Sequence, residues 1–220
     1  MGTALPVAHH ASRLAALAAV PLLLAPPQAG AQSLWLEVRA GLVVSTALAE
    51  DAVANASLRQ RLGERFDGPV RALPAAGPGI TIAAVSNLRT RTRVELAAGW
   101  TFSRLVVEEA GTRRAIQDLG VAQASLGIRY MVRDRIDAAC GFGAAHYVAD
   151  DRGLFAGGTG LTPLVECGAG VATMATGRRF LLRATAQVQR FRTGVLSDAA
   201  ARTGTVLRFA IQAGIAMPVR

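Results

Sequence analysis

From residue 34 onward, the chain alternates apolar and polar side chains with a period of two residues. In the stretch LWLEVRAGLVVS (34–45), Leu36 and Val38 share an apolar face, while Glu37 and Arg39 share the opposite, polar face. A β-strand has this period, whereas a helix repeats every 3.6 residues. The pattern therefore predicts an all-β chain whose sheet has one apolar face and one polar face.

Eight stretches carry this alternation and are predicted to be strands. Most are longer than the roughly five or six residues typical of soluble sheets. They suit the roughly 9–11 tilted residues that a strand needs to cross a membrane. By residue number, the predicted strands are 34–45, 79–87, 93–102, 121–132, 136–144, 161–171, 180–188 and 205–215.

The connections between the predicted strands alternate in length. The short ones are NLRTRT (87–92), VRDR (132–135) and TGRR (176–179). The long ones are 48–78, 108–118, 149–160 and 194–204. Outer-membrane barrels have tight periplasmic turns and longer external loops. The sequence therefore predicts an eight-stranded antiparallel up-and-down transmembrane β-barrel with both termini in the periplasm.

The first long connection carries apolar residues at helical spacing, namely Leu58, Leu62 and Phe66. This spacing predicts a short amphipathic helix. We interpret it as a solvated helical turn within the loop, with a lid or a contact to the lipid surface as alternatives.

The polar face of the predicted strands carries four acidic and four basic side chains, and it becomes the lumen if the apolar face meets lipid. These residues are Glu37, Arg39, Glu95, Arg129, Asp137, Glu166, Arg183 and Arg208. An eight-stranded barrel is just wide enough for its side chains to fill it, and pairing lowers the cost of burying each charge. We predict a network of ion pairs that plugs the lumen, with a small ion path as the alternative.

The N-terminal residues have the arrangement of an export signal. A short apolar run, 14–25, is followed by Ala29 and Ala31, which offer a small-residue cleavage site. That run is too short to span a bilayer as a helix, and no later stretch holds the roughly 18 consecutive apolar residues of a transmembrane helix. We predict a signal peptide over 1–31 and a barrel domain over 32–220, with an uncleaved anchor or a buried helix as the alternative.

Composition narrows the function classes. The chain is 51% hydrophobic and carries a formal net charge of +9. This apolar content argues against disorder. Its arginines are scattered singly, without a basic block or interleaved aromatic residues, so the charge does not favour nucleic-acid binding.

Few residues suggest catalysis. His146 is the only histidine after residue 31, and Asp150 and Asp151 follow it. No G-x-S-x-G motif is present, and one histidine with two loop aspartates does not fill a metal site. We predict no enzyme activity, no metal and no cofactor. His146 is better placed beside Tyr147 at the level of the lipid headgroups. A lipid-modifying barrel enzyme that uses His146 is kept as an alternative.

The two cysteines, Cys140 and Cys167, lie on the predicted fifth and sixth strands with the same facing. Their midpoint falls within the connecting loop, so symmetric pairing places them opposite each other. An exported protein meets an oxidising compartment. A cross-strand disulfide is therefore one possibility, and two unpaired apolar residues on the lipid face are the other.

The strand count, the alternation of loop lengths and the paired charges of the lumen together resemble the small outer-membrane β-barrel family typified by the transmembrane domain of OmpA and by OmpX. The resemblance covers most of 34–219. It implies a location in the outer membrane of a Gram-negative-type bacterium, contact with outer-membrane lipids and insertion by the barrel-assembly machinery. We therefore predict a structural or surface-interacting role, with an extracellular partner that is unknown. A secreted soluble β-barrel that binds a small apolar ligand is the alternative.

Overall fold

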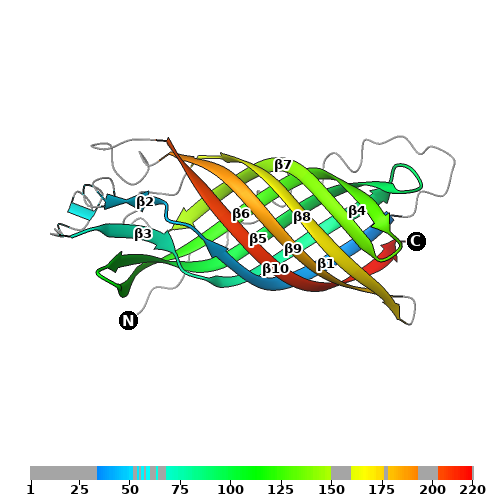
Figure 1. Cartoon of the computed structure of the whole chain (residues 1–220), viewed down its shortest axis with the longest axis horizontal. Coiled ribbons are helices and arrows are strands. Elements are labelled where there is room, and N and C mark those ends of the chain that lie inside the picture. The colour runs from blue at the N-terminus through cyan, green and yellow to red at the C-terminus, as the bar shows by residue number, and fades with distance from the viewer. Residues whose placement is uncertain are drawn as a thin grey trace, which may run out of the picture. The chain divides into compact units, whose positions relative to one another are not determined.

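The computed structural model arranges the chain as ten β-strands (Figure 1). It describes residues 34–51, 54, 56, 58, 59, 63, 68–149, 160–175, 178–192 and 203–219. The strands are β1 (Leu34–Ser45), β2 (Ala49–Glu50), β3 (Val70–Pro74), β4 (Gly77–Asn87), β5 (Thr92–Glu109), β6 (Thr112–Arg133), β7 (Ile136–Ala149), β8 (Thr162–Ala175), β9 (Arg178–Arg192) and β10 (Thr203–Val219). The predicted signal peptide, 1–31, lies outside the described residues.

Eight of these strands form a closed antiparallel ring in the order β1, β4, β5, β6, β7, β8, β9 and β10. The ring closes where β1 pairs with β10, with Leu34 opposite Val219 and Ser45 opposite Arg208. Figure 1 shows the strands running obliquely around the barrel. Closure removes the unpaired strand edges of an open sheet. The predicted eight-stranded up-and-down barrel is confirmed.

The short strands β2 and β3 extend the ring at one end. Along β5, β3 continues the line of β4, since Pro74 lies opposite Leu105 and Gly79 lies opposite Thr101. In turn, β2 follows β1 in the chain and pairs with β3. The prediction of a single loop over 48–78 is therefore wrong at both of its ends, because these strand extensions lack the regular alternation that marks the membrane-crossing part.

A second extension is the hairpin of β5 and β6. It is closed by Ala110 and Gly111, which both have positive φ, 48° and 82°, as a two-residue type I′ turn requires. Glu108 lies opposite Arg113 across this hairpin. The prediction of a loop over 108–118 is wrong. The start of β6 is exposed on both faces, so no apolar alternation marks it as a strand.

The two ends of the barrel differ in how their strands are joined. At one end, called the turn end, lie the first residue of β1, the last residue of β10 and the short β4–β5, β6–β7 and β8–β9 connections. The opposite end, called the loop end, holds β2 and β3, the last residues of β7 and β9, the first residues of β8 and β10, and the β5–β6 hairpin tip. The predicted turn VRDR is confirmed, since β6 ends at Arg133 and β7 begins at Ile136.

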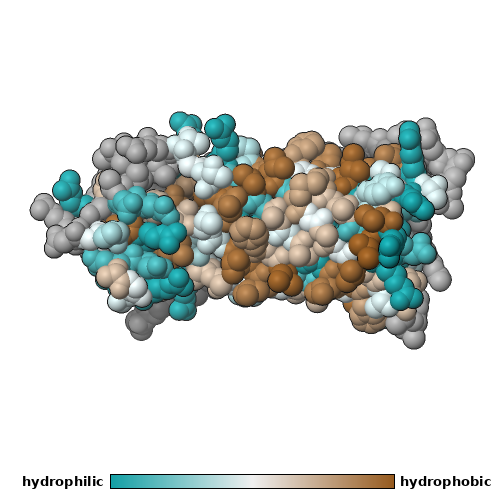
Figure 2. Space-filling model, viewed as in Figure 1, coloured by the Kyte–Doolittle hydropathy of each residue, from teal (hydrophilic) through white to brown (hydrophobic). Residues whose placement is uncertain are grey.

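An apolar belt encircles the middle of the barrel, and charged side chains gather at its two ends (Figure 2). Outward-facing Phe142, Leu182 and Ile211 are each more than half exposed. The apolar face of every predicted strand thus points outward, as the alternation predicted. Soluble monomers rarely expose a contiguous apolar surface of this extent, whereas transmembrane barrels have such a band.

Part of the helix predicted in the first loop is described. The helical residues there are 51, 54, 56, 58 and 59. The amide of Gly63 donates to the carbonyl of Arg59 at 3.2 Å. Leu58 is fully buried against the loop end of the barrel. This corrects the interpretation as a solvated turn, while Leu62 and Phe66 lie outside the described residues.

Within the part of the chain that the structure describes, no helix has the length and apolarity needed to cross a membrane.

Candidate functional site

Arg129 on β6 lies at the centre of a group of charged side chains inside the barrel. Its guanidinium donates to the two oxygens of Glu37 at 2.6 and 2.9 Å. It also donates twice to Oε2 of Glu95, at 2.7 and 3.1 Å. Only 2% of Arg129 is exposed. The planar fork of arginine, with five N–H donors, allows one side chain to hold two carboxylates in this way.

Two more arginines and an aspartate complete this group. We call it the ion-pair cluster, which consists of Glu37, Arg39, Glu95, Arg129, Asp137 and Arg183. Arg39 donates to Oε1 of Glu95 at 2.6 Å, and Arg183 pairs with Asp137. A second nitrogen of Arg183 lies 3.9 Å from Glu95. Three guanidinium groups thus face three carboxylates, and this balance offsets much of the desolvation cost of burying them.

Glu166 and Arg208, which were predicted to join the same network, lie outside the ion-pair cluster. Glu166 accepts hydrogen bonds from Ser125 at 2.7 Å and from Gln187 at 2.9 Å. Arg208 donates to Thr101 at 2.8 Å and to Gln187 at 3.4 Å. Neither makes an ion pair with another described residue. The prediction is corrected here, because the neutral amide of Gln187 bridges the two charges.

Uncharged polar side chains that the sequence analysis did not single out fill the space around this bridge. Gln212 donates to Thr81 at 2.9 Å, and Arg208 donates to Gln123 at 2.9 Å. Gln189 donates weakly to Gln187 at 3.4 Å. Their position on the inner face of each strand is the sequence signal that would identify them.

At the loop end, the lumen changes from polar to apolar. The rings of Tyr147 and Phe191 are fully buried and meet edge-on, with centroids 5.3 Å apart. They belong to a buried group that we call the apolar cap, which consists of Leu48, Ala49, Ala54, Leu58, Val70, Ala72, Leu105, Val107, Leu119, Val121, Ala145, Tyr147, Leu164, Phe191 and Val206. The prediction of a polar inner face is wrong at this end. The strand extensions here pack their inward side chains as an ordinary hydrophobic core.

Inward-facing glycines leave room for the ion-pair cluster. A Cβ atom on Gly214 would come within 2.3 Å of the carbonyl oxygen of Val38 on the neighbouring strand and within 2.8 Å of Cγ of Arg39. A Cβ atom on Gly170 would come within 3.3 Å of the Asp137 carboxylate. Such approaches are tighter than ordinary van der Waals contact, so the close packing of long charged side chains depends on these small residues.

A cavity of about 40 Å³ lies in the polar middle of the lumen. Its lining includes Arg39, Glu95, Ser125, Glu166 and Arg208. This volume holds a few water molecules. The described side chains therefore fill most of the lumen, as is common in eight-stranded barrels.

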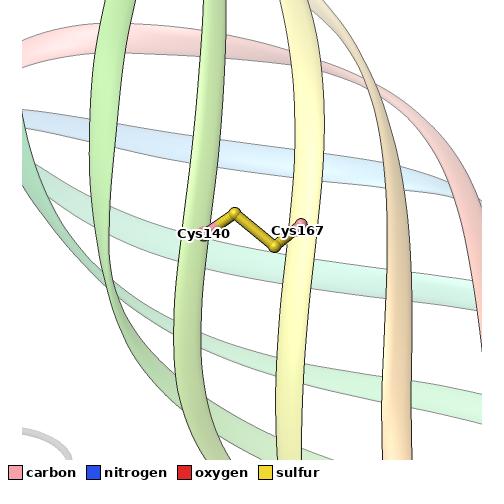
Figure 3. The surroundings of a disulfide bond; sticks show 2 residues. All are labelled: Cys140 and Cys167. Atoms are coloured by element: carbon pink, nitrogen blue, oxygen red, sulfur yellow. A yellow bond between two sulfur atoms is a disulfide. The ribbon is translucent and has the colours of Figure 1, made fainter.

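The two cysteines are joined across β7 and β8. Cys140 lies directly opposite Cys167 with their Cα atoms 4.1 Å apart, and a disulfide links them (Figure 3). Phe142 and Val165, which are paired on the same face two residues away, point outward. The disulfide therefore lies on the outer surface, within the apolar belt.

His146 lies on the outer face of β7, opposite Ala122. Tyr147 beside it does not lie at the outer surface, because its side chain points into the lumen and donates to Gln189 at 2.6 Å. Asp150 and Asp151 lie outside the described residues. Among the residues that the structure describes, no group of three or more His, Cys, Asp or Glu side chains is placed to hold a metal ion.

The fold is shared with known outer-membrane proteins. The alignment with the outer membrane protein OprG from Pseudomonas aeruginosa covers 87% of this chain and 98% of OprG, at 10% identity and a TM-score of 0.50. The alignment with Neisserial surface protein A covers 84% of this chain and 97% of that protein, at 9% identity and a TM-score of 0.52. The alignment with the outer membrane protein AlkL, solved in DMPC lipid bilayers, covers 89% of this chain and 95% of AlkL, at 12% identity and a TM-score of 0.51.

These likenesses establish the fold. The chain has the architecture of small eight-stranded outer-membrane β-barrels, which confirms the predicted resemblance at the level of the fold. No family model matches the chain, and no curated protein matches it.

Proposed function

We propose that this protein is an outer-membrane β-barrel of a Gram-negative-type bacterium. One observation carries the proposal: the polarity of the barrel is inverted relative to a soluble protein. Arg129 and Glu37 are almost fully buried, whereas Phe142 and Ile211 are more than 60% exposed. Burial of apolar surface drives folding in water, so an exposed apolar belt around a charged interior fits a barrel whose surroundings are lipid.

We propose a structural or surface-interacting role for this barrel, without enzyme activity. The ion-pair cluster and the apolar cap support this role, because they close the lumen in two separate layers. The loop end then offers the surface on which a partner binds, since its extensions rise beyond the apolar belt. In this proposal both termini face the periplasm and the loop end faces the outside, in keeping with the usual short periplasmic turns.

The alternative of a soluble barrel for an apolar ligand is opposed by the same inversion. Such a barrel needs an apolar lumen with open space and a polar exterior. Here the middle of the lumen is polar and mostly filled. The apolar cap is packed with the protein's own side chains.

The proposal is tested by cell fractionation combined with gel electrophoresis of unboiled and boiled samples. We expect the protein in the outer-membrane fraction, with a mobility that changes on boiling because the closed barrel resists detergent until heated. Recovery in the soluble periplasmic fraction without a mobility change refutes the proposal.

Two further measurements test the role of the lumen and the absence of enzyme activity. In planar lipid bilayers, we expect no stable conductance steps from the wild-type protein, and regular steps of one size contradict a plugged lumen. Lipid turnover in the membrane fraction is expected to be unchanged by His146→Ala. A clear loss of turnover contradicts the non-enzymatic role.

A further inference from the structure

The turn end of the barrel carries an unusual excess of arginine. Its three short connections, 87–92, 132–135 and 176–179, contain Arg89, Arg91, Arg133, Arg135, Arg178 and Arg179. The same segments contain one acidic residue, Asp134. The chain as a whole is far more balanced, with 24 basic and 15 acidic residues. The positive charge of the protein is therefore concentrated at this end.

Five of these arginines face solvent, and we call them the arginine rim: Arg89, Arg91, Arg133, Arg135 and Arg178. None of the five makes an ion pair or a side-chain hydrogen bond with another described residue. Arg179 differs, because its guanidinium lies over the inward-facing Trp35 ring, 4.1 Å from the centroid. The rim thus presents guanidinium groups that no other described side chain pairs with.

The loop end provides an internal comparison. Three of its exposed arginines, Arg71, Arg104 and Arg113, have acidic partners on neighbouring strands. Arg71 lies 2.9 Å from Glu50, and Arg113 lies 2.8 Å from Glu108. Several exposed arginines are thus paired at the loop end, whereas none of the five rim arginines forms an ion pair with another described residue.

The arginine rim borders the apolar belt directly. Leu88 precedes Arg89, Val132 precedes Arg133, and both apolar side chains are more than half exposed. At a membrane surface, an arginine stem can lie along apolar surface while its head reaches the polar interface. A planar guanidinium also binds phosphate through two parallel hydrogen bonds. The rim combines both requirements at one level of the barrel.

We infer that the arginine rim binds the headgroups of anionic phospholipids in the leaflet at the turn end. The inference rests on the proposed membrane location and adds a lipid preference to it. A lipid fits the rim better than a soluble acidic partner, because Arg89, Arg133 and Arg135 adjoin the exposed apolar side chains of Leu88, Val132 and Ile136, which a lipid covers at the same time. Clustered basic residues beside a membrane-spanning segment are known to attract anionic lipids.

The test measures the lipid that remains bound to the purified protein. The protein is placed in nanodiscs of equimolar phosphatidylglycerol and phosphatidylcholine, extracted gently, and the bound lipids are counted by native mass spectrometry. We expect roughly a five-fold or greater enrichment of phosphatidylglycerol. Replacing all five rim arginines with glutamine is expected to reduce the enrichment to about one-fold, because the charge that attracts the lipid is gone.

A matched control separates the rim from net charge. Five loop-end arginines, Arg71, Arg104, Arg113, Arg190 and Arg192, are replaced with glutamine, which removes the same charge. This control is expected to keep the enrichment, and a rim variant with lysine is expected to keep most of it. The inference is overturned if the rim variant retains the preference, or if both glutamine variants lose it equally.

Two additional measurements use the wild-type protein and do not depend on the variants folding. Raising the salt from about 0.1 to 1 M shortens the screening length from about 10 to 3 Å and is expected to abolish the enrichment, and a salt-independent preference overturns the inference. Soluble glycerol phosphate at constant ionic strength is expected not to compete. Effective competition would indicate a simple anion site instead. If the proposed membrane location is wrong, the result is different, because the protein then does not insert into the nanodiscs and retains neither phosphatidylglycerol nor phosphatidylcholine.

Discussion

Arg129 offers the sharpest test of the ion-pair cluster. Its replacement by methionine removes four hydrogen bonds to Glu37 and Glu95 of 2.6 to 3.1 Å. Glu95 keeps Arg39 at 2.6 Å, but Glu37 keeps only a contact of 3.9 Å to Nε of Arg39. Most of the penalty therefore comes from Glu37, which remains buried without a close partner.

We expect Arg129→Met to lower the free energy of unfolding by about 3–5 kcal/mol, the range for a buried pair that loses one member. Adding Glu37→Gln to this variant restores charge balance in the cluster. The double variant is therefore expected to be more stable than the sum of the two single changes predicts, by about 2 kcal/mol. Unfolding by urea in lipid vesicles, followed by tryptophan fluorescence and by gel mobility, measures each value.

The control is Arg104→Met, which removes a largely exposed partner of Asp118 at 3.4 Å. An exposed pair contributes about 0–1 kcal/mol. A loss of less than about 1 kcal/mol for Arg129→Met, equal to that of the control, refutes the view that the lumen is held by buried ion pairs. Strict additivity of the double variant refutes the direct coupling of Arg129 to Glu37.

Three other changes probe the packing of the barrel. Gly214→Ala is expected to lower the free energy of unfolding by about 1–3 kcal/mol by crowding the lumen. Gly204→Ala, whose Cβ meets no atom within 4 Å, is the control and is expected to change it little. Equal effects of the two changes contradict the role of Gly214. Cys140→Ser with Cys167→Ser is expected to lower the free energy of unfolding by up to about 3.5 kcal/mol for a separation of 27 residues. In the wild type, thiol reagents are expected to label the cysteines only after reduction. Labelling before reduction contradicts the disulfide. Tyr147→Phe is expected to cost about 1–3 kcal/mol, because it leaves a buried amide oxygen without this donor, and an unchanged urea midpoint contradicts the contribution of that hydrogen bond.

The sequence predicted the membrane-crossing part of the fold well because lipid imposes a strict rule there. Every second residue must be apolar, so the facing of residues such as Ile211 and Arg183 follows from their parity alone. Beyond the belt this rule no longer applies. The start of β6 is exposed on both faces, and the inner face near Tyr147 is apolar. Both features therefore look irregular in the sequence.

The candidate site shows a similar limit. Parity identifies which charged residues share the inner face, but the partner of each depends on the stagger of strands that are distant in the chain. Arg129 reaches Glu37 on a strand 92 residues earlier, and Glu166 has Gln187 rather than an arginine beside it. The position of Cys140 opposite Cys167 could be anticipated more easily, because adjacent strands of one hairpin set their own register.

The inverted polarity of the barrel can be tested most directly with nitroxide spin labels in a Cys140→Ser, Cys167→Ser background. Labels are attached at Phe142 and Ile211 in the apolar belt and at Thr203 near the loop end, and the protein is placed in lipid vesicles. The account predicts that the two belt labels collide mainly with oxygen, which dissolves in lipid, and that the Thr203 label collides mainly with a water-soluble nickel chelate. Dominant collisions with the nickel chelate at Phe142 and Ile211 would contradict the account, because the belt would then face water.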